Sequence, residues 1–382
     1  MTPKALTQRF HLEDVKRVVI KVGTRVIDQK ETQFNRPAIE SLVKEIAELR
    51  KKHIEVVLVS SGAVGAGLRV LGVAGRPVSI HLRQAYAAVG QGRLMNLYSR
   101  LFAEYDIMTA QVLLTRSDLD RRTSFLNARE TLEHLLTIGV LPIINENDTV
   151  ATEELKFGDN DMLAALVAGK VNAGLLILLT TVDGLYRRFE KGKTASDLIP
   201  IIDQNLDDVQ SFVRDKKDPL SMGGMRSKLA AADIASSKGI PVVISNGLKP
   251  GVIGDLFSGQ AMATWIIPAR KRMAAWKYYL AFAKTLSGGK IIVDDGAAKA
   301  LRQGGKSLLA SGVQETLGTF ERKDLVQITD LKGNEFARGL ARMSSKELIK
   351  IQGRSSQEIR AILNTRKAAI VVHCDNLVLV ER

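Results

Sequence analysis

The chain has 382 residues, of which 45% are hydrophobic and 25% are charged, so we expect a globular protein long enough for two domains. Its single cysteine, Cys374, excludes an intrachain disulfide, and no Cys/His cluster has the spacing of a structural zinc site. No apolar run approaches the ~18 residues of a membrane span, and the first residues lack the apolar core of a secretory signal, so we expect a cytoplasmic protein. The net charge of +14 lies mainly in the last third: residues 1–269 carry 34 Lys and Arg against 30 Asp and Glu, and residues 270–382 carry 21 against 11.

Apolar runs of strand length alternate with helical patterns over the first two thirds of the chain. The run at 15–22 contains Lys21 and ends at Gly23, and the run at 54–59 ends in Ser60-Ser61-Gly62. Each run is followed by a helical pattern, which is the rhythm of a parallel sheet covered by helices. Further strands are expected at 108–114, 140–144, 175–179, 241–245 and 264–267, and helices at 36–53, 82–105, 124–137 and 225–239.

The pattern of predicted elements changes in the last third of the chain. Short strands are expected at 291–293, 326–328 and 370–372, between glycine-rich turns, with helical patterns at 296–303, 344–352 and 355–364. We therefore predict an α/β fold with a mainly parallel sheet sandwiched by helices over residues 1–267. A linker is expected at 268–285, followed by a small β-rich domain over 286–382.

Two polar clusters stand at the ends of buried elements. The run Asn145-Glu146-Asn147-Asp148 directly follows an apolar strand, and ligands of α/β proteins bind at the carboxyl ends of strands. The second cluster, residues 158–161, precedes an apolar helix, so Asp159 or Asn160 is expected as its N-cap. Taken alone, the second cluster is sufficiently explained as a turn followed by a helix cap. The unbroken polar run of the first favours a binding site.

A glycine pair before the helix at 225–239 gives a second kind of signal. Gly223-Gly224 would leave backbone N–H groups exposed at a helix N-terminus, which is a site for phosphate, and Lys228 follows one turn later. With Lys21 at a strand end, this favours phosphoryl transfer, which depends on positioning and charge neutralisation. The Walker pattern and the H-R-D and D-F-G signatures of protein kinases are absent.

These motifs together resemble the amino acid kinase family. The pieces are Lys21-Val-Gly-Thr, Ser60-Ser-Gly-Ala, Ile144-Asn-Glu-Asn-Asp, Gly158-Asp-Asn-Asp and Gly223-Gly-Met. Their order and spacing are similar to those of the glutamate kinases of that family, and residues 287–365 resemble a PUA domain. The resemblance implies ATP-dependent phosphorylation of the γ-carboxylate of L-glutamate, the first step of proline synthesis.

The resemblance also implies roles for particular residues. Lys21 and Lys228 would stabilise the transferred phosphoryl group, and Asp161 would orient both lysines. The remaining roles fall into two sets. Glutamate would be held by Ser61, Asp148 and Asn160, with Asn145 and Asp159 close by. ATP would be bound by Lys21, Thr180, Thr181, Met222, Gly223, Gly224, Met225, Arg226, Ser227 and Lys228.

The resemblance implies ligands and partners as well. Mg²⁺ would be carried by the nucleotide phosphates, with no metal ligand from the protein. Proline would be the feedback inhibitor, a glutamyl phosphate reductase would take the product, and the chain would form a homo-oligomer. The family often has Thr-Asp where this chain has Thr180-Thr181, and Thr where it has Met222, so individual ATP contacts differ.

Two alternatives remain open. The chain could be another kinase of the family, acting on acetylglutamate, aspartate or UMP. It could also bind RNA through its basic, PUA-like tail, although no aromatic RNA-binding motif is visible.

Overall fold

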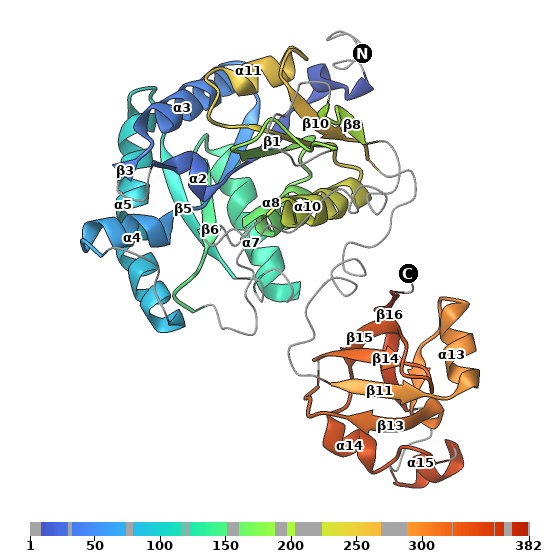
Figure 1. Ribbon diagram of the computed structural model, residues 1–382. Coiled ribbons are helices and arrows are strands. Elements are labelled where there is room, and N and C mark those ends of the chain that lie inside the picture. Colours follow the sequence, from blue (N-terminus) through green and yellow to red (C-terminus); the bar gives the residue numbers. More distant parts are fainter. Residues whose placement is uncertain are drawn as a thin grey trace. The chain divides into compact units, whose positions relative to one another are not determined.

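The computed structural model (Figure 1) describes residues 9–29, 33–73, 79–115, 118, 122–150, 160–187, 197–202, 224–268, 289–322, 324–354, 356–362 and 369–380. The chain forms two compact units, Met1–Arg272 and Met273–Arg382. Among the described residues, no helix is both long enough and apolar enough to cross a membrane.

The first unit is built on an eight-stranded sheet in the order β5-β6-β4-β1-β7-β9-β10-β8. Its strands are β1 (Arg17–Val22), β4 (Glu55–Ser60), β5 (Thr109–Leu114), β6 (Leu141–Glu146), β7 (Leu175–Thr180), β8 (Ile201–Ile202), β9 (Val242–Asn246) and β10 (Ala263–Ile266). The six strands from β5 to β9 are parallel, and β10 runs antiparallel to β9. The expectation of a mainly parallel sheet is confirmed.

Helices cover both faces of this sheet, and the side chains of β1 alternate between the two faces. Val18, Ile20 and Val22 face α3 (Arg36–Lys51), α5 (Ile80–Ala103) and α11 (Val252–Phe257) within one apolar core. The opposite face is covered by α8 (Asn160–Lys170) and α10 (Met225–Ser237), which lie side by side, and α7 (Arg122–Thr137) packs near β6. Lys21, which has the opposite parity in β1, therefore faces α8 and α10.

Strand β1 lies where the chain reverses its direction across the sheet. Its neighbours are β4 on one side and β7 on the other, so the chain moves outward to β5 and then returns past β1. In open α/β sheets, ligands bind beside the carboxyl ends of strands at such a switch point. The topology therefore places the carboxyl end of β1, with Lys21, at the expected ligand site.

A close helix pair follows β4. Helices α4 (Ala63–Val70) and α5 pack at two glycines: a Cβ at Gly67 would lie 1.8 Å from the carbonyl oxygen of Tyr86, and one at Gly90 would lie 1.8 Å from that of Ala63. Any larger residue would separate the two helices. The remaining small elements of this unit are η1 (Leu12–Asp14), α2 (Thr24–Ile27), β2 (Asp28–Gln29) and β3 (Gln33–Phe34).

The second unit has its own six-stranded sheet and its own core. The sheet order is β12-β16-β15-β14-β11-β13, and among these pairs only β11 and β14 are parallel. Phe320 and Phe336 are buried at its centre. The elements are β11 (Lys290–Val293), α13 (Asp295–Arg302), β12 (Leu308–Leu309), η4 (Ala310–Gly312), β13 (Val313–Leu317), β14 (Leu325–Thr329), β15 (Glu335–Ala341), α14 (Ser345–Ile349), α15 (Ser356–Ile362) and β16 (Ile370–Leu379). This unit is the β-rich module that the sequence predicts.

Strands β13 and β15 and helix α11 were not predicted from the sequence, and other differences concern the ends of elements. Strand β16 is much longer than the predicted 370–372, and α8 begins at Asn160 rather than after it, so Asn160 is a helical residue and not the cap. The predicted linker, 268–285, lies outside the described residues from 269 onward.

Candidate active site

A buried carboxylate joins two buried lysines at the centre of the first unit. Asp161, in the first turn of α8, lies with Oδ1 2.6 Å from Nζ of Lys21 on β1 and with Oδ2 2.8 Å from Nζ of Lys228 on α10. The side chains of Asp161, Lys21 and Lys228 are 0%, 5% and 7% exposed. Two cations and one anion leave a net positive charge in a poorly solvated place, which suits an anionic ligand.

The N-terminus of α10 lies beside this cluster. Gly224 is its N-cap, Met225 and Arg226 are its first two residues, and the hydroxyl of Ser227 donates 2.9 Å bonds toward both Asp161 Oδ2 and the carbonyl of Gly224. The backbone N–H groups of a first helical turn have no partner inside the helix and attract phosphate. Lysine ammonium groups and a helix N-terminus thus share one anion-binding region.

A second set of polar groups lies on the other side of α8. The amide nitrogen of Asn160 donates to the carbonyl oxygen of Ser60 (3.0 Å), to Oγ of Ser61 (2.9 Å) and to Oδ1 of Asn145 (2.8 Å). Asn145 in turn donates from Nδ2 to Oε1 of Gln91 on α5 at 2.8 Å. Side chains from α8, β6 and α5 therefore form one chain of amides, which the Ser60 carbonyl and the Ser61 hydroxyl join at the end of β4.

Two backbone groups fix the direction of every amide in this chain. The carbonyl of Ser60 can only accept, so Asn160 presents its nitrogen there and its oxygen elsewhere. The N–H of Glu146 donates to Oδ1 of Asn145 at 2.9 Å, so Asn145 donates from Nδ2 to Gln91. This arrangement leaves one polar atom at each end of the amide chain, Oδ1 of Asn160 and Nε2 of Gln91. Both atoms are buried without a hydrogen-bond partner in the described part of the protein.

Of these two atoms, Oδ1 of Asn160 is a hydrogen-bond acceptor and Nε2 of Gln91 is a donor. Buried polar atoms normally have a partner, so an acceptor and a donor without one indicate a ligand or water that supplies the opposite groups. An α-amino acid does so, because its ammonium group donates and its carboxylate accepts. The amide chain is therefore suited to a zwitterionic amino acid.

Asp148 lies in the adjoining pocket. Ala63, Gln91, Asn147 and Asp148 are among the residues that line this space of about 310 Å³. Burial raises the pKa of Asp148, and the charge of Arg83 offsets this only in part. A desolvated carboxylate gains from a cationic ligand.

The turn between β4 and α4 shapes the same pocket. Gly62 adopts φ 106° at the N-cap of α4, a left-handed conformation that glycine adopts without strain. Ser61 precedes it and bonds to Asn160. The Ser-Ser-Gly sequence thus ends β4, supplies the hydroxyl that bonds to Asn160 and starts the helix.

Polar residues also follow β7 and β9, on the far side of β1 from Ser61. Thr180 ends β7 and pairs with Asn246 at the end of β9. Asn246 donates to Asp183 at 3.2 Å, and Lys249 lies 2.7 Å from the same carboxylate. Burial acts to raise the pKa of Asp183, but the hydrogen bonds from Lys249 and Asn246 outweigh it, so the pKa lies below its ordinary value.

The predicted site residues therefore fall into two described groups. Lys21, Asp161 and Lys228 meet in the charged cluster, and Ser61, Asn145 and Asn160 meet in the amide chain. Asp159, Met222 and Gly223 lie outside the described residues. Sequence reasoning missed Gln91, whose only signal was a polar residue at an inward position of a long helix. It also missed the Asp183 cluster, although Asp183 follows a buried strand just as Asp148 does.

The carboxylate at the centre of the lysine cluster is engaged by cations. Both carboxylate oxygens of Asp161 already contact lysines. Over the described residues, the one group of His, Cys, Asp and Glu side chains close enough to share an ion is His373, Cys374 and Asp375, in the second unit.

Comparison with protein families agrees with this architecture. Residues 16–246 match the amino acid kinase family, and residues 289–363 match the PUA domain. The chain therefore belongs to the amino acid kinase family and carries a PUA domain after its kinase domain.

Relatives that the chain resembles over nearly its whole length carry the name glutamate 5-kinase. The one from Geobacter sulfurreducens is 43% identical over 96% of this chain and 98% of the relative. The one from Trichlorobacter lovleyi is 44% identical over 97% and 99%, and the one from Caldanaerobacter subterraneus is 42% identical over 96% and 98%.

Proposed function

We propose that the protein phosphorylates L-glutamate on its γ-carboxylate with ATP, giving L-glutamyl 5-phosphate and ADP. The observation that carries this proposal is the double role of the first turn of α8. Asn160 belongs to an amide chain suited to an amino acid, and Asp161, the next residue, belongs to a cationic cluster suited to phosphate. The name shared by the relatives supports the same substrate.

In the proposed reaction, an oxygen of the γ-carboxylate attacks the γ-phosphorus of ATP. The bond from that phosphorus to the β,γ-bridging oxygen breaks, and its electron pair leaves with ADP. The carboxylate is ionised at neutral pH, so no protein base is needed. Lys21 and Lys228 would neutralise the charge on the transferred group, and Asp161 would hold both ammonium groups in place.

The substrate's amino acid end would be held by the amide chain. Asn160 Oδ1 and Asp148 would accept from the α-ammonium group, and Gln91 Nε2 would donate to the α-carboxylate, with Ser61, Asn145 and Asp159 close by. N-acetylglutamate has an amide in place of the ammonium group, so it would leave the acceptor groups poorly satisfied.

The nucleotide would lie over the N-terminus of α10 and the ends of β7 and β9. Its phosphates would meet Lys21, Lys228 and the helix N-terminus, with Thr180 and Thr181 at its side. The nucleotide site proposed from the sequence comprises those residues together with Met222, Gly223, Gly224, Met225, Arg226 and Ser227. Mg²⁺ supplies further charge neutralisation when bound, and we propose that the nucleotide phosphates carry it, since Asp161 is engaged by lysines.

A hydroxamate assay tests the function directly. Hydroxylamine converts an acyl phosphate into a stable hydroxamate and releases phosphate, so purified protein with ATP, Mg²⁺ and L-glutamate should yield γ-glutamyl hydroxamate. Parallel reactions contain aspartate, N-acetylglutamate or UMP. Hydroxamate from aspartate or N-acetylglutamate but not from glutamate, or UDP formed from UMP, would reject the proposed substrate.

The biological setting belongs to the same proposal. ATP and glutamate are cytoplasmic metabolites, so we place the reaction in the cytoplasm, where a glutamyl phosphate reductase would use the labile product. Proline is itself a zwitterionic amino acid, so it could occupy the Gln91 and Asn160 groups and inhibit in competition with glutamate. A glutamate KM that does not change with proline would contradict this assignment.

We also propose a homo-oligomer. Val70, Leu71, Val73 and Leu82, near the adjoining ends of α4 and α5, are large apolar side chains with at least 40% of their surface exposed. Such a patch is typical of an interaction surface. Light scattering coupled to size-exclusion chromatography should give a mass above that of one chain, and a monomer at micromolar concentration would reject this.

RNA binding by the PUA domain is a second candidate function, favoured by the excess of 21 Lys and Arg over 11 Asp and Glu in residues 270–382. Retention on immobilised RNA should then weaken steeply with salt. No retention at low salt would remove this candidate.

A further inference from the structure

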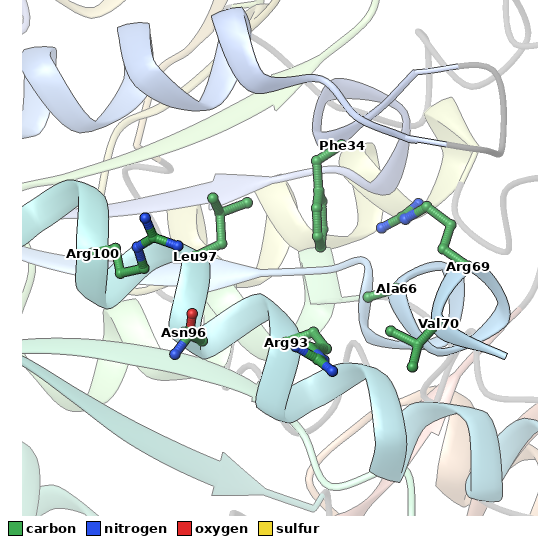
Figure 2. A pocket seen from close by; sticks show the side chains of 8 residues that line it. All are labelled: Phe34, Ala66, Arg69, Val70, Arg93, Asn96, Leu97 and Arg100. Atoms are coloured by element: carbon green, nitrogen blue, oxygen red, sulfur yellow. The ribbon is translucent and has the colours of Figure 1, made fainter.

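A pocket of the first unit lies apart from both halves of the active site. It has a volume of about 420 Å³ and lies between β3, α4 and α5. Figure 2 shows its eight lining residues: Phe34, Ala66, Arg69, Val70, Arg93, Asn96, Leu97 and Arg100. None of these residues joins the lysine cluster or the amide chain described above.

The pocket is lined by three arginines and by no acidic residue. Arg93 and Arg100 lie on exposed positions of α5, and neither has an acidic partner in the part of the chain that the structure describes. A concave surface with one sign of charge concentrates ions of the opposite sign. The charge of this pocket therefore favours an anion.

Arg69 is held in a fixed position on the opposite wall. Its Nη1 lies 2.7 Å from Oδ1 of Asp28, and its Cζ lies 4.2 Å from the centroid of the Phe34 ring. The side chain is only 10% exposed, and its Nη2 is buried without a hydrogen-bond partner among the described residues. In Figure 2 this guanidinium group extends from α4 toward Phe34, along the edge of the pocket.

A buried guanidinium nitrogen without a partner is an unusual feature. Buried donors are nearly always satisfied, and a guanidinium group offers a planar fork that fits the oxygens of phosphate or carboxylate. Asp28 uses only one of the terminal nitrogens. The other, Nη2, has no hydrogen-bond partner among the described residues, and a small movement of this side chain would let it donate to an oxyanion in the pocket.

The sequence of α5 arranges the facing wall. Arg93, Asn96, Leu97 and Arg100 follow the spacing i, i+3, i+4 and i+7, which places them on one face of a helix. The same helix turns its Leu94, Tyr98 and Leu101 into the core. The two arginines are thus presented together to the pocket, with an amide between them.

We propose that this pocket, lined by Arg69, Arg93 and Arg100, is a binding site for a phosphate-bearing metabolite, separate from the active site. The three guanidinium groups and Asn96 would hold the phosphate. Ala66, Val70 and Leu97 would contact an uncharged part of the ligand, since the volume exceeds that needed for one phosphate group.

The site is connected to the active site by the closely packed helix pair. Helix α4 starts directly after Ser61 and Gly62, and α5 carries Gln91 two residues before Arg93. Because Gly67 and Gly90 leave the two backbones in close contact, a ligand that moves one helix moves the other.

Isothermal titration with sodium pyrophosphate, in Mg²⁺-free buffer at constant ionic strength, tests the proposal. The test variant is Arg93→Gln/Arg100→Gln, both at exposed positions. The control is Lys44→Gln/Lys52→Gln, at exposed positions on and just after α3, which changes the net charge by the same amount. The test variant should bind pyrophosphate roughly tenfold or more weakly than the wild type, and the control should bind as the wild type does.

Pyrophosphate could also bind at the catalytic lysines, so Lys228→Met is titrated as well. The Lys228→Met variant should still bind pyrophosphate at the arginine-lined pocket, which is the binding that Arg93→Gln/Arg100→Gln loses. Equal affinity of the wild type and the arginine variant, or loss of all binding in Lys228→Met, would overturn the site. Citrate in place of pyrophosphate tests the ligand class, because tight binding of citrate without binding of pyrophosphate would reject a phosphate ligand.

Discussion

Replacing Asp161 by asparagine tests how much the protein depends on one buried carboxylate. The change keeps the shape of the side chain but removes the negative charge that contacts both Lys21 and Lys228, at 2.6 and 2.8 Å. Leaving a buried charge without its partner costs about 3–5 kcal/mol. For a domain of this size, such a loss lowers the melting temperature by about 6–20 °C.

The same change should reduce catalysis, because the two ammonium groups would no longer be held where charge develops. Loss of one such preorganised electrostatic contact lowers kcat by roughly 10²–10³-fold. Hydroxamate production at saturating ATP and glutamate measures kcat, and thermal unfolding followed by circular dichroism measures stability.

Ser227→Ala is the matched control for Asp161→Asn. It removes a hydroxyl that bonds to the same carboxylate at 2.9 Å but removes no charge, so it should cost only about 1 kcal/mol. If Asp161→Asn kept a kcat within about threefold of the wild type, the claim that electrostatic preorganisation drives this step would be wrong. Equal melting temperatures for the two variants would refute the argument from buried charge.

Three further predictions concern glutamate binding and the second domain. Gln91→Leu should raise the glutamate KM by roughly 10–150-fold, which is the effect of losing a hydrogen bond to a charged group, and should leave the ATP KM unchanged. Gln111→Leu, in the same pocket, is the control. Because burial raises the pKa of Asp148, that carboxylate becomes protonated at a higher pH than an ordinary aspartate; the glutamate KM should therefore begin to rise, as the pH is lowered, before the ordinary aspartate range is reached, and an Asp148→Asn variant with the same pH profile would contradict the assigned role. A chain of residues 1–268 should keep kinase activity, since the first unit has its own core; a fragment that does not fold, as judged by circular dichroism, would show that the PUA domain is structurally required.

The sequence predicted the architecture well because the physical signals are local. An apolar run such as residues 175–179 is typical of a central strand, and the alternation of such runs with helical patterns predicted a parallel sheet. Once the sheet is parallel, the polar residues after several strands must share one edge. Ser61 and Asn145 both lie at that edge and contact Asn160, but their roles were predicted from the family resemblance, and the order of the strands could not be read from the sequence.

The amide chain could not be predicted in the same way. Gln91 lies in the middle of a 24-residue helix at an inward position, but the sequence pattern does not show which distant side chain it meets there. Its role depends on the close packing of α4 and α5, which brings that helix face toward β6. Pairings of this kind depend on tertiary contacts between distant segments, whereas a sequence pattern reports only the face of a helix.

The first turn of α8 explains why the site needs so few residues. Successive residues of a helix point about 100° apart, so Asn160 and Asp161 face different neighbours from adjacent positions. Asn160 reaches the ends of β4 and β6, and Asp161 reaches β1 and α10. A shift of α8 by one residue would remove both the amide contacts and the lysine contacts at once. In the proposed reaction, this one helix would align the donor and the acceptor of the phosphoryl group, so catalysis would depend on the position of α8 rather than on any single contact.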